Sequence, residues 1–436
     1  MSVPTFVLPE HPQRRALNDE VHARPPVRLQ GPHRIVFLAI RHSPAERDAH
    51  RDAIRRIAES RGEHAQPADH AIVSLAPGLR LKWEGHAEFS SYTFFREGES
   101  RMPPGDVLAA AGWTEVAKVL PGEIFVAATI ELARAAGDAP PPDAFETKAD
   151  TVVGGALAEG RGWAYTDFRI REDGFTHFLI LARADMGVGQ SGRMVQRLLE
   201  IETYRMMALT AFPLARESLP ELAAMETELG RVVERIAGAT TADEAKLLDG
   251  LTNLAAHVER LQNDTSFRFQ ASEAYDALVK RRIAELREVR IPGLQTIEEF
   301  MQRRLAPAMA TCRSTSQRIG HLAARVARAS ALLRTRVDIA REQQNQLILA
   351  AMNRRSRLQL KLQQAVEGLS VVVITYYGAS LVGVLAKALK VGGAPVNPDI
   401  AAAVSVPFIA LAVFLAARGL RRSLYAESGE PVGGPR

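Results

Sequence analysis

Two stretches near the C-terminus decide the architecture: GLSVVVITYYGASLVGVLA, residues 368–386, and IAAAVSVPFIALAVFLAA, residues 400–417. Neither contains a charged side chain. Each has close to the ~20 residues that a helix needs to cross the hydrocarbon core of a bilayer. A pair of buried core helices would give the same pattern, but two such stretches joined by a short loop favour a membrane hairpin. The sequence therefore predicts two transmembrane helices within residues 367–418.

Basic side chains flank this predicted hairpin on both outer sides. They are Arg354, Arg355, Arg357 and Lys361 before the first span, Arg418, Arg421 and Arg422 after the second, and Lys387 and Lys390 in the loop. Basic residues concentrate on the cytosolic side of membrane proteins, and the first five residues lack the features of a signal peptide. We expect a multi-pass protein with a lipid bilayer as partner, both termini in the cytosol, and a tail, residues 419–436, that is basic and then disordered.

The first predicted span contains polar and small side chains. Tyr376 and Tyr377 lie in its middle, where their hydroxyl groups need hydrogen-bond partners in a helix interface or a pore. Gly378, Ser380 and Gly383 form a small-residue face that suits close helix contact. We therefore predict that these five residues serve membrane helix packing or line a pore.

Residues 216–366, called the stalk here, are predicted to be helical and to form a coiled coil. The chain has no proline between Pro307 and Pro395. Apolar residues follow spacings of three, four and seven, as in a coiled coil: Leu333, Val337, Ala340, Leu347, Ala351, Leu358 and Ala365. A helix this long needs partners, which can be the helices within Leu219–Arg290 or the same helix of a second copy. We therefore expect a homo-oligomer held by the stalk and the transmembrane helices.

Residues 1–215 alternate between strand and helix patterns, which predicts an α+β domain in the cytosol. Ser43 and Glu46 form a capping box that opens a helix ending near Ser60. Glu172-Asp173-Gly174 is a hairpin turn signal. The predicted order, β-α-β-β-α-β-β-β-α, indicates a sheet with helices on one face. The predicted strands are 33–40, a β-hairpin or one long bent strand within 79–96, 123–132, 151–158, 162–171 and 176–183.

The composition excludes some classes of function. The net charge is +5, and no block of five or more like charges occurs, so a nucleic-acid-binding arm is not expected. The single cysteine, Cys312, allows no internal disulfide and no cysteine-based zinc site. G-x-S-x-G and H-E-x-x-H motifs are absent from the sequence. The sequence therefore predicts no catalytic residues, no enzyme activity and no particular cofactor.

Two clusters are candidate ligand or metal sites. In the first, Glu20 and His22 can ligate a metal or exchange protons, and Arg24 can bind an anion. The alternative is that these residues dock an N-terminal arm. In the second, residues 84, 86 and 88 alternate along a predicted strand, which places the side chains of Glu84, His86 and Glu88 on one face. That face could hold Zn²⁺ or Mn²⁺, or be the wet face of a half-buried sheet.

Residues 17–25 carry the pattern LNxExHARP, formed here by Leu17, Asn18, Glu20, His22, Ala23, Arg24 and Pro25. This pattern resembles the hallmark of a family of uncharacterised, membrane-anchored bacterial proteins. Residues 83–89, 291–300 and 376–378 resemble the same family, so the resemblance covers nearly the whole chain. It implies a protein of the bacterial inner membrane and brings no established activity.

The order of a cytosolic α/β domain, long helices and a C-terminal two-span hairpin is similar to CorA-type magnesium channels. Those channels carry Tyr-Gly-Met-Asn at the outer end of the first span. This chain has Tyr377-Gly378-Ala379-Ser380 inside the span instead. Two hypotheses for function follow. The first is a membrane-anchored scaffold or sensor of unknown ligand, and the alternative is a CorA-like oligomeric channel without the usual selectivity motif.

Overall fold

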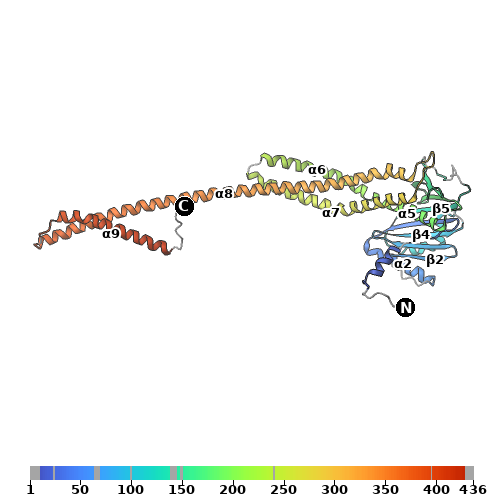
Figure 1. Cartoon of the computed structure of the whole chain (residues 1–436), viewed down its shortest axis with the longest axis horizontal. Coiled ribbons are helices and arrows are strands. Elements are labelled where there is room, and N and C mark those ends of the chain that lie inside the picture. The colour runs from blue at the N-terminus through green and yellow to red at the C-terminus, as the bar shows by residue number, and fades with distance from the viewer. Residues whose placement is uncertain are drawn as a thin grey trace. The chain divides into compact units, whose positions relative to one another are not determined.

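The computed structural model describes residues 10–22, 25–62, 69–98, 101–137, 145–147, 151–238, 241–393 and 395–427. Contacts divide the chain into two compact units, Met1–Ala331 and Leu332–Arg436. The first unit holds a sheet with helices on it, and the second holds the end of a long helix and a further helix after it (Figure 1). The first unit thus includes the predicted α+β domain and the first part of the stalk.

An eight-stranded mixed sheet lies at the centre of the first unit. Its strand order is β2-β3-β4-β1-β5-β8-β7-β6. The β5–β8 pair is parallel, and the other neighbouring pairs are antiparallel. The strands are β1 His33–Arg41, β2 His70–Ala76, β3 Leu79–Gly85, β4 Phe89–Glu97, β5 Glu123–Arg134, β6 Val153–Leu157, β7 Gly162–Ile170 and β8 Thr176–Ala182.

The local sequence signals gave most of these elements. The backbone N–H and hydroxyl of Ser43 both donate to Glu46 Oε2 at 2.8 Å, which confirms the capping box ahead of α2 Arg47–Ser60. The predicted hairpin turn joins β7 to β8, with Gly174 at φ +82°. The strand β2 was not predicted. Its sequence, HAIVSLA, alternates apolar and polar side chains as a half-buried strand does.

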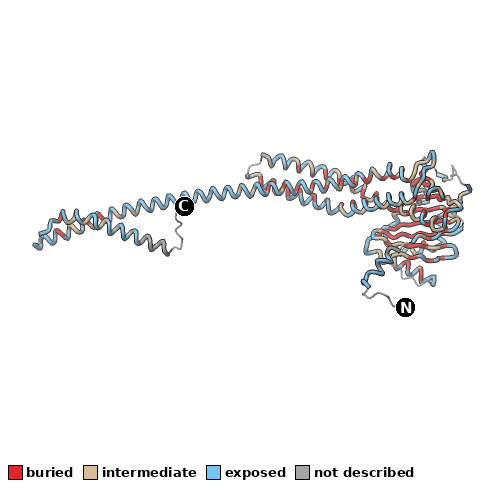
Figure 2. Tube along the Cα trace, viewed as in Figure 1, coloured by how far each residue is buried: buried red, intermediate tan, exposed pale blue. Residues whose placement is uncertain are grey.

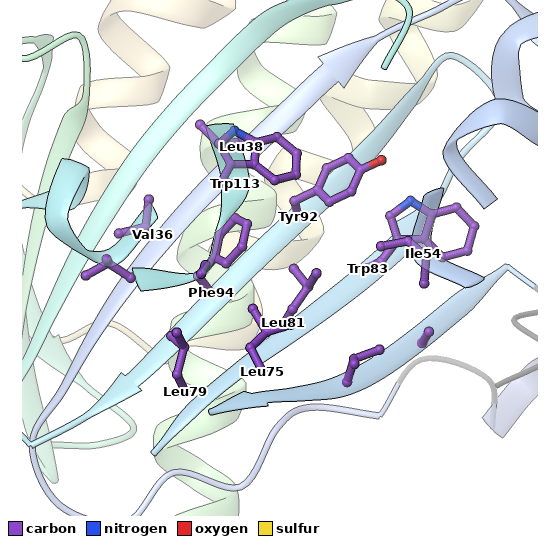
Figure 3. Packing of buried hydrophobic residues seen from close by; sticks show 14 of the residues in the cluster. Val36, Leu38, Ile54, Leu75, Leu79, Leu81, Trp83, Tyr92, Phe94 and Trp113 are labelled. Carbon is purple, nitrogen blue, oxygen red and sulfur yellow. The ribbon is translucent and has the colours of Figure 1, made fainter. Parts of the chain in front are cut away.

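One face of the sheet packs against short helices. These are α2, α3 Pro104–Ala110 and α4 Trp113–Ala117. The core on this face includes Trp83 and Tyr92 from neighbouring strands and Trp113 from α4 (Figure 3). The rings of Tyr92 and Trp113 are tilted with centroids 4.8 Å apart, an arrangement that aromatic pairs favour. This face supplies the main hydrophobic cluster of the sheet.

The opposite face is also covered, so the prediction of helices on one face is wrong. Helix α5 Val188–Leu209 lies on it and packs in turn against α7 Thr241–Leu286. A Cβ atom at Gly192 of α5 would lie 1.8 Å from the carbonyl oxygen of Val27, so only glycine allows this close approach. The sequence pattern did not reveal this second layer because polar residues line much of the covered face.

The remaining long helices of the first unit pack side by side. They are α6 Ala211–Gly238, α7, and the first part of α8 Ile297–Val391, and they lie together in Figure 1. Arg318 of α8 donates to Glu226 of α6 at 2.7 and 3.2 Å. Arg313 of α8 donates to Glu273 of α7 at 3.3 Å. The predicted partnership between the long helix and the preceding helices is therefore confirmed for this part of α8.

The second unit exposes its apolar side chains. It contains the rest of α8 and the helix α9 Pro398–Glu427. Both helices are long and apolar enough to span a membrane, and their most apolar windows are only 17% and 0% buried. Figure 2 shows most of the described part of this unit as exposed, with intermediate and a few buried positions in the apolar segments of α8 and α9. Core helices of a soluble protein are mostly buried, so the two helices do not behave as such a pair.

Candidate functional site

Polar side chains of β3 and β4 form the floor of a cavity under α5. Lys82 is paired across the strands with Thr93, and Glu84 is paired with Ser91. Alternate residues of a strand point to opposite faces, so these four side chains lie on the side away from Trp83 and the main core. The pairing of β3 with β4 thus places the polar side chains of both strands next to one another on the face that α5 covers.

Helix α5 forms the roof of this cavity, and one side chain of α7 closes it laterally. The roof residues recur every three or four positions, the spacing of one helix face: Val195, Gln196, Leu199, Glu200, Thr203 and Tyr204. Arg282 is the contribution of α7. The volume of the cavity is about 180 Å³. We call this space the sheet–helix cavity.

The floor carries a buried ion pair. Lys82 Nζ lies 3.0 Å from Glu84 Oε1, and the side chains are only 4% and 13% exposed. A buried charge is tolerated only when it is paired, because removing it from water costs several kcal/mol. Because they are paired with each other, Lys82 and Glu84 can both remain charged on the floor of the sheet–helix cavity.

The roof carries a second pair of opposite charges. Glu200 Oε2 accepts from Arg282 Nε, and Arg282 also donates to Glu285 at 3.0 and 3.1 Å. Gln196 Nε2 donates to Glu200 Oε1 at 2.8 Å. Burial raises the pKa of Glu200, the carboxylate of Glu84 raises it further, and Gln196 and Arg282 offset part of that rise. The sheet–helix cavity is thus lined by two carboxylates and two positively charged side chains: Glu84, Glu200, Lys82 and Arg282.

The predicted alternation of residues 84, 86 and 88 along one strand is wrong. Strand β3 ends at Gly85, and β4 begins at Phe89. Glu84 and His86 line the cavity, with the His86 ring stacked on Phe89 at 4.3 Å between centroids. The turn directs Glu88 to α7, where Arg268 and the Tyr275 hydroxyl donate to its carboxylate, the latter at 3.2 Å. Burial, and then Glu88, raise the pKa of Tyr275.

The hypothesis of a metal at residues 84, 86 and 88 gains no support from the geometry. Across the described residues, no group of three or more His, Cys, Asp and Glu side chains is arranged to hold a metal ion. The side chains of Glu20 and His22, which belong to α1 Arg14–His22, and the whole of Arg24 lie outside the described residues. The site predicted at those three positions remains a prediction.

A second buried polar cluster lies on the opposite face of the sheet. His50 Nδ1 is 2.8 Å from the Tyr92 hydroxyl, and His50 Nε2 is 3.0 Å from the Pro121 carbonyl oxygen. His42 Nε2 is 3.0 Å from Ser90 Oγ, and the two imidazole rings lie 4.5 Å apart. Burial, followed by the neighbouring His42, lowers the pKa of His50 to about 4. Because carbonyl oxygens only accept, a neutral His50 donates from Nε2 to Pro121.

The five residues predicted for membrane packing or a pore divide between two faces of α8. A Cβ atom at Gly378 would lie 3.0 Å from Ile409 Cγ2 of α9, and one at Gly383 would lie 3.4 Å from Ala402 Cβ. These glycines therefore face α9. Ser380 is exposed, and Tyr376 and Tyr377 are 72% and 69% exposed. The tyrosines and Ser380 thus form a polar face that α9 does not cover.

Sequence reasoning named only Glu84 and His86 of the sheet–helix cavity and missed the rest, among them Lys82, Gln196, Glu200 and Arg282. Lys82 and Glu84 do alternate with Leu81 and Trp83, which signals a strand with one polar face. That alternation is equally typical of a strand facing water. Gln196 and Glu200 are four residues apart in a helical pattern, as many solvent-exposed pairs are. No local signal could show that the polar face of the sheet meets this face of α5.

Fold and site together define a class of protein in which an α+β unit with a charged, partly enclosed cavity is joined to two apolar helices. The chain belongs to the family described as protein of unknown function (DUF3422), whose model matches residues 9–424. No curated protein matches the chain, and no solved structure does.

Proposed function

We propose that the protein is a membrane-anchored sensor or scaffold of the bacterial inner membrane, with a ligand site in its cytosolic α+β domain. The observation that carries this proposal is the sheet–helix cavity, which places ionic groups on both of its walls. Charged side chains are rarely fully buried unless they are paired, so a cavity with ionic groups on both walls is an unusual feature of a fold. The same chain exposes two apolar helices that are long enough to span a membrane. In this proposal the cavity is the ligand site and the two helices are the membrane anchor.

The basic residues that flank the apolar helices support the proposed orientation. Because basic residues concentrate on the cytosolic side, they favour an orientation with both ends of the chain in the cytosol and the connection between α8 and α9 outside. In this arrangement α8 runs without a break from the first unit into the anchor. Changes in the first unit that displace α8 would then be transmitted into the bilayer.

Thiol labelling in intact cells tests the orientation. The only cysteine, Cys312, is buried, so Cys312→Ser gives a clean background. Val396→Cys, in the α8–α9 connection, should react with a membrane-impermeant maleimide in intact cells. Ile72→Cys, on an exposed position of β2, should react only after lysis. Labelling of Ile72→Cys in intact cells would overturn the cytosolic assignment.

A CorA-like channel is a second candidate, and the polar face of Tyr376, Tyr377 and Ser380 favours it. Tyrosine hydroxyls at mid-span need partners that lipid cannot supply, so this face suits contact with further copies around a pore. The apolar side chains of Leu347, Leu358 and Leu362 are exposed along the stalk and suit the same assembly. The homo-oligomer therefore belongs to both proposals.

The mass of the solubilised protein separates the two candidates. A channel with two spans per chain needs several chains around one pore, so a monomer or dimer in detergent would exclude it. A larger ring that carries no cation flux in liposomes would leave the sensor or scaffold. A ring with selective cation flux would establish the channel.

A further inference from the structure

The sheet–helix cavity has polar groups with unused bonding capacity. Gln196 Oε1 is buried and has no hydrogen-bond partner among the described residues. Lys82 is almost fully buried, and its ammonium group, which has three N–H donors, forms one ion pair among the described residues, with Glu84 at 3.0 Å. Buried polar groups are normally satisfied. The cavity thus offers a free acceptor on the roof and free donors on the floor.

The charges that line the cavity sum to zero but are spread over both walls. The floor carries Lys82 and Glu84, and the roof and side carry Glu200 and Arg282. A ligand with a single charge would leave a net charge in a partly dry space, which is costly. A ligand with one charge of each sign keeps the occupied cavity neutral.

Aromatic rings supply the apolar part of the wall. Phe37, Phe89, Phe95 and Tyr204 all line the cavity and are at most 9% exposed. Aromatic faces attract organic ammonium groups, most strongly where water is excluded. The roof combines Tyr204 with the Glu200 carboxylate and the free Gln196 oxygen, so it suits an ammonium group. The floor, with Lys82 and the hydroxyl of Thr93, suits a carboxylate.

The size of the cavity limits the ligand further. Sites for drug-sized molecules occupy roughly 300–1,000 Å³, whereas this cavity occupies about 180 Å³. Glu84, His86 and Arg282 are only partly buried, so the space reaches solvent at their end. A molecule of a few carbon atoms can therefore enter and bridge the two walls.

We propose that the sheet–helix cavity binds a small zwitterion, such as an amino acid, with its ammonium group at Glu200 and Gln196 and its carboxylate at Lys82. This assignment rests on the proposed sensor function and names the class of its ligand. The ammonium donates to the roof acceptors while the carboxylate accepts from Lys82. One bound molecule then supplies a hydrogen-bond donor to Gln196 Oε1 and an acceptor to the ammonium group of Lys82.

Titration calorimetry on the full-length protein in detergent tests the ligand class. The probes are γ-aminobutyrate, butylammonium and butyrate, which share a carbon chain and differ in charged ends, with glycine as a shorter zwitterion. A zwitterion should bind roughly 10- to 100-fold more tightly than either singly charged probe, since it adds one charge-assisted hydrogen-bonded contact. Equal affinities, tighter binding of a singly charged probe, or no binding by any of the four at millimolar concentration would overturn the assignment.

Matched substitutions locate the two ends of the bound zwitterion. Glu200→Gln should weaken zwitterion and butylammonium binding by roughly 10-fold or more, whereas butyrate, which neutralises the positive charge left in the cavity, should bind no more weakly than before. Lys82→Met combined with Glu84→Gln avoids an unpaired buried charge and should weaken zwitterion and butyrate binding. Glu221→Gln and Lys118→Met, at exposed positions, are the controls. Equal effects of cavity and control substitutions would overturn the assignment, with tryptophan fluorescence confirming that each variant is folded.

Failure of this assignment is distinguishable from failure of the proposed function. Thiol labelling of Val396→Cys and Ile72→Cys reports the anchor and its orientation with no ligand present. A correct orientation with no zwitterion binding would reject the ligand class alone. Labelling of Ile72→Cys in intact cells would reject the cytosolic sensor, whatever the cavity binds.

Discussion

The two units of the chain differ in how far they bury apolar side chains. In the first unit, Leu81 is 1% exposed and even Lys82 is 4% exposed. In the second unit, Leu358 is 58% exposed, and the buried apolar side chains among its described residues are Leu333, Ala379 and Ala386. The first unit therefore buries its apolar side chains in its own core. The second unit relies on surroundings outside the single chain, which we propose to be lipid and further copies.

Removing the second unit should have the largest effect. A chain that ends at Ala331 lacks both apolar helices, so it should move almost completely from the membrane fraction to the soluble fraction. All three tryptophans, Trp83, Trp113 and Trp163, lie in the first unit, so their fluorescence reports whether that unit stays folded. Fractionation by ultracentrifugation gives the distribution. A folded truncated chain that still sediments with membranes would show that the first unit binds membranes itself.

The same substitution in the two units should give very different free energies of unfolding. Leu81→Ala removes a buried side chain from the main core and should destabilise the first unit by about 2–5 kcal/mol. Leu358→Ala removes an exposed side chain and should change the stability of the first unit by less than about 0.5 kcal/mol. Denaturant titration followed by tryptophan fluorescence measures both. A large loss for Leu358→Ala would show that the units fold cooperatively.

The buried histidine should make the first unit sensitive to acid. The folded-state pKa of His50, about 4, lies below its ordinary value of 6.5, so the unfolded chain binds this proton first as the pH falls. His50 then contributes no pH dependence above about pH 6.5. Between pH 6.5 and 4 it should lower the free energy of unfolding progressively, by about 3 kcal/mol at the lower end.

His50→Gln provides the comparison for this pH dependence. The variant is less stable at neutral pH if it loses one of the two hydrogen bonds to Tyr92 and Pro121, but it lacks the titrating group. Denaturant titrations at pH 7 and pH 4.5 should therefore show a smaller drop for the variant than for the natural sequence. Equal drops would place the acid sensitivity at other groups.

Breaking the contact between the sheet and α7 should have the smallest effect of the four. Glu88→Gln removes the charge that Arg268 and Tyr275 contact and should cost about 1–3 kcal/mol. Combining it with Arg268→Met should cost less than the two single substitutions added together, because the arginine is no longer left unpaired. Glu97→Gln, on an exposed position at the end of β4, is the control. Additive costs would mean that the pair contributes little to holding α7.

The comparison also explains which predictions from sequence succeeded. The strand regions other than β2, the capping box at Ser43 and the turn at Gly174 follow from signals within a few residues of each other. The strand β2 was missed although its alternation is plain. Of the residues that line the sheet–helix cavity, only Glu84 and His86 were named from the sequence, and they were placed on one strand with Glu88, because the other polar residues of the cavity are far apart in the chain. Their burial depends on the docking of α5 and α7.

The sequence by itself determined the two apolar helices, the long helical segment and the mixed α+β character of the N-terminal region. These properties follow from hydrophobic runs and short-range periodicity, which are readable residue by residue. Only the tertiary structure decided that α5 covers the second face of the sheet, that Glu88 turns away to Arg268, and that Gly378 and Gly383 pack against α9 while Tyr376 and Tyr377 do not. Each of these depends on contacts between segments distant in sequence, where the same polar pattern fits either water or a buried partner.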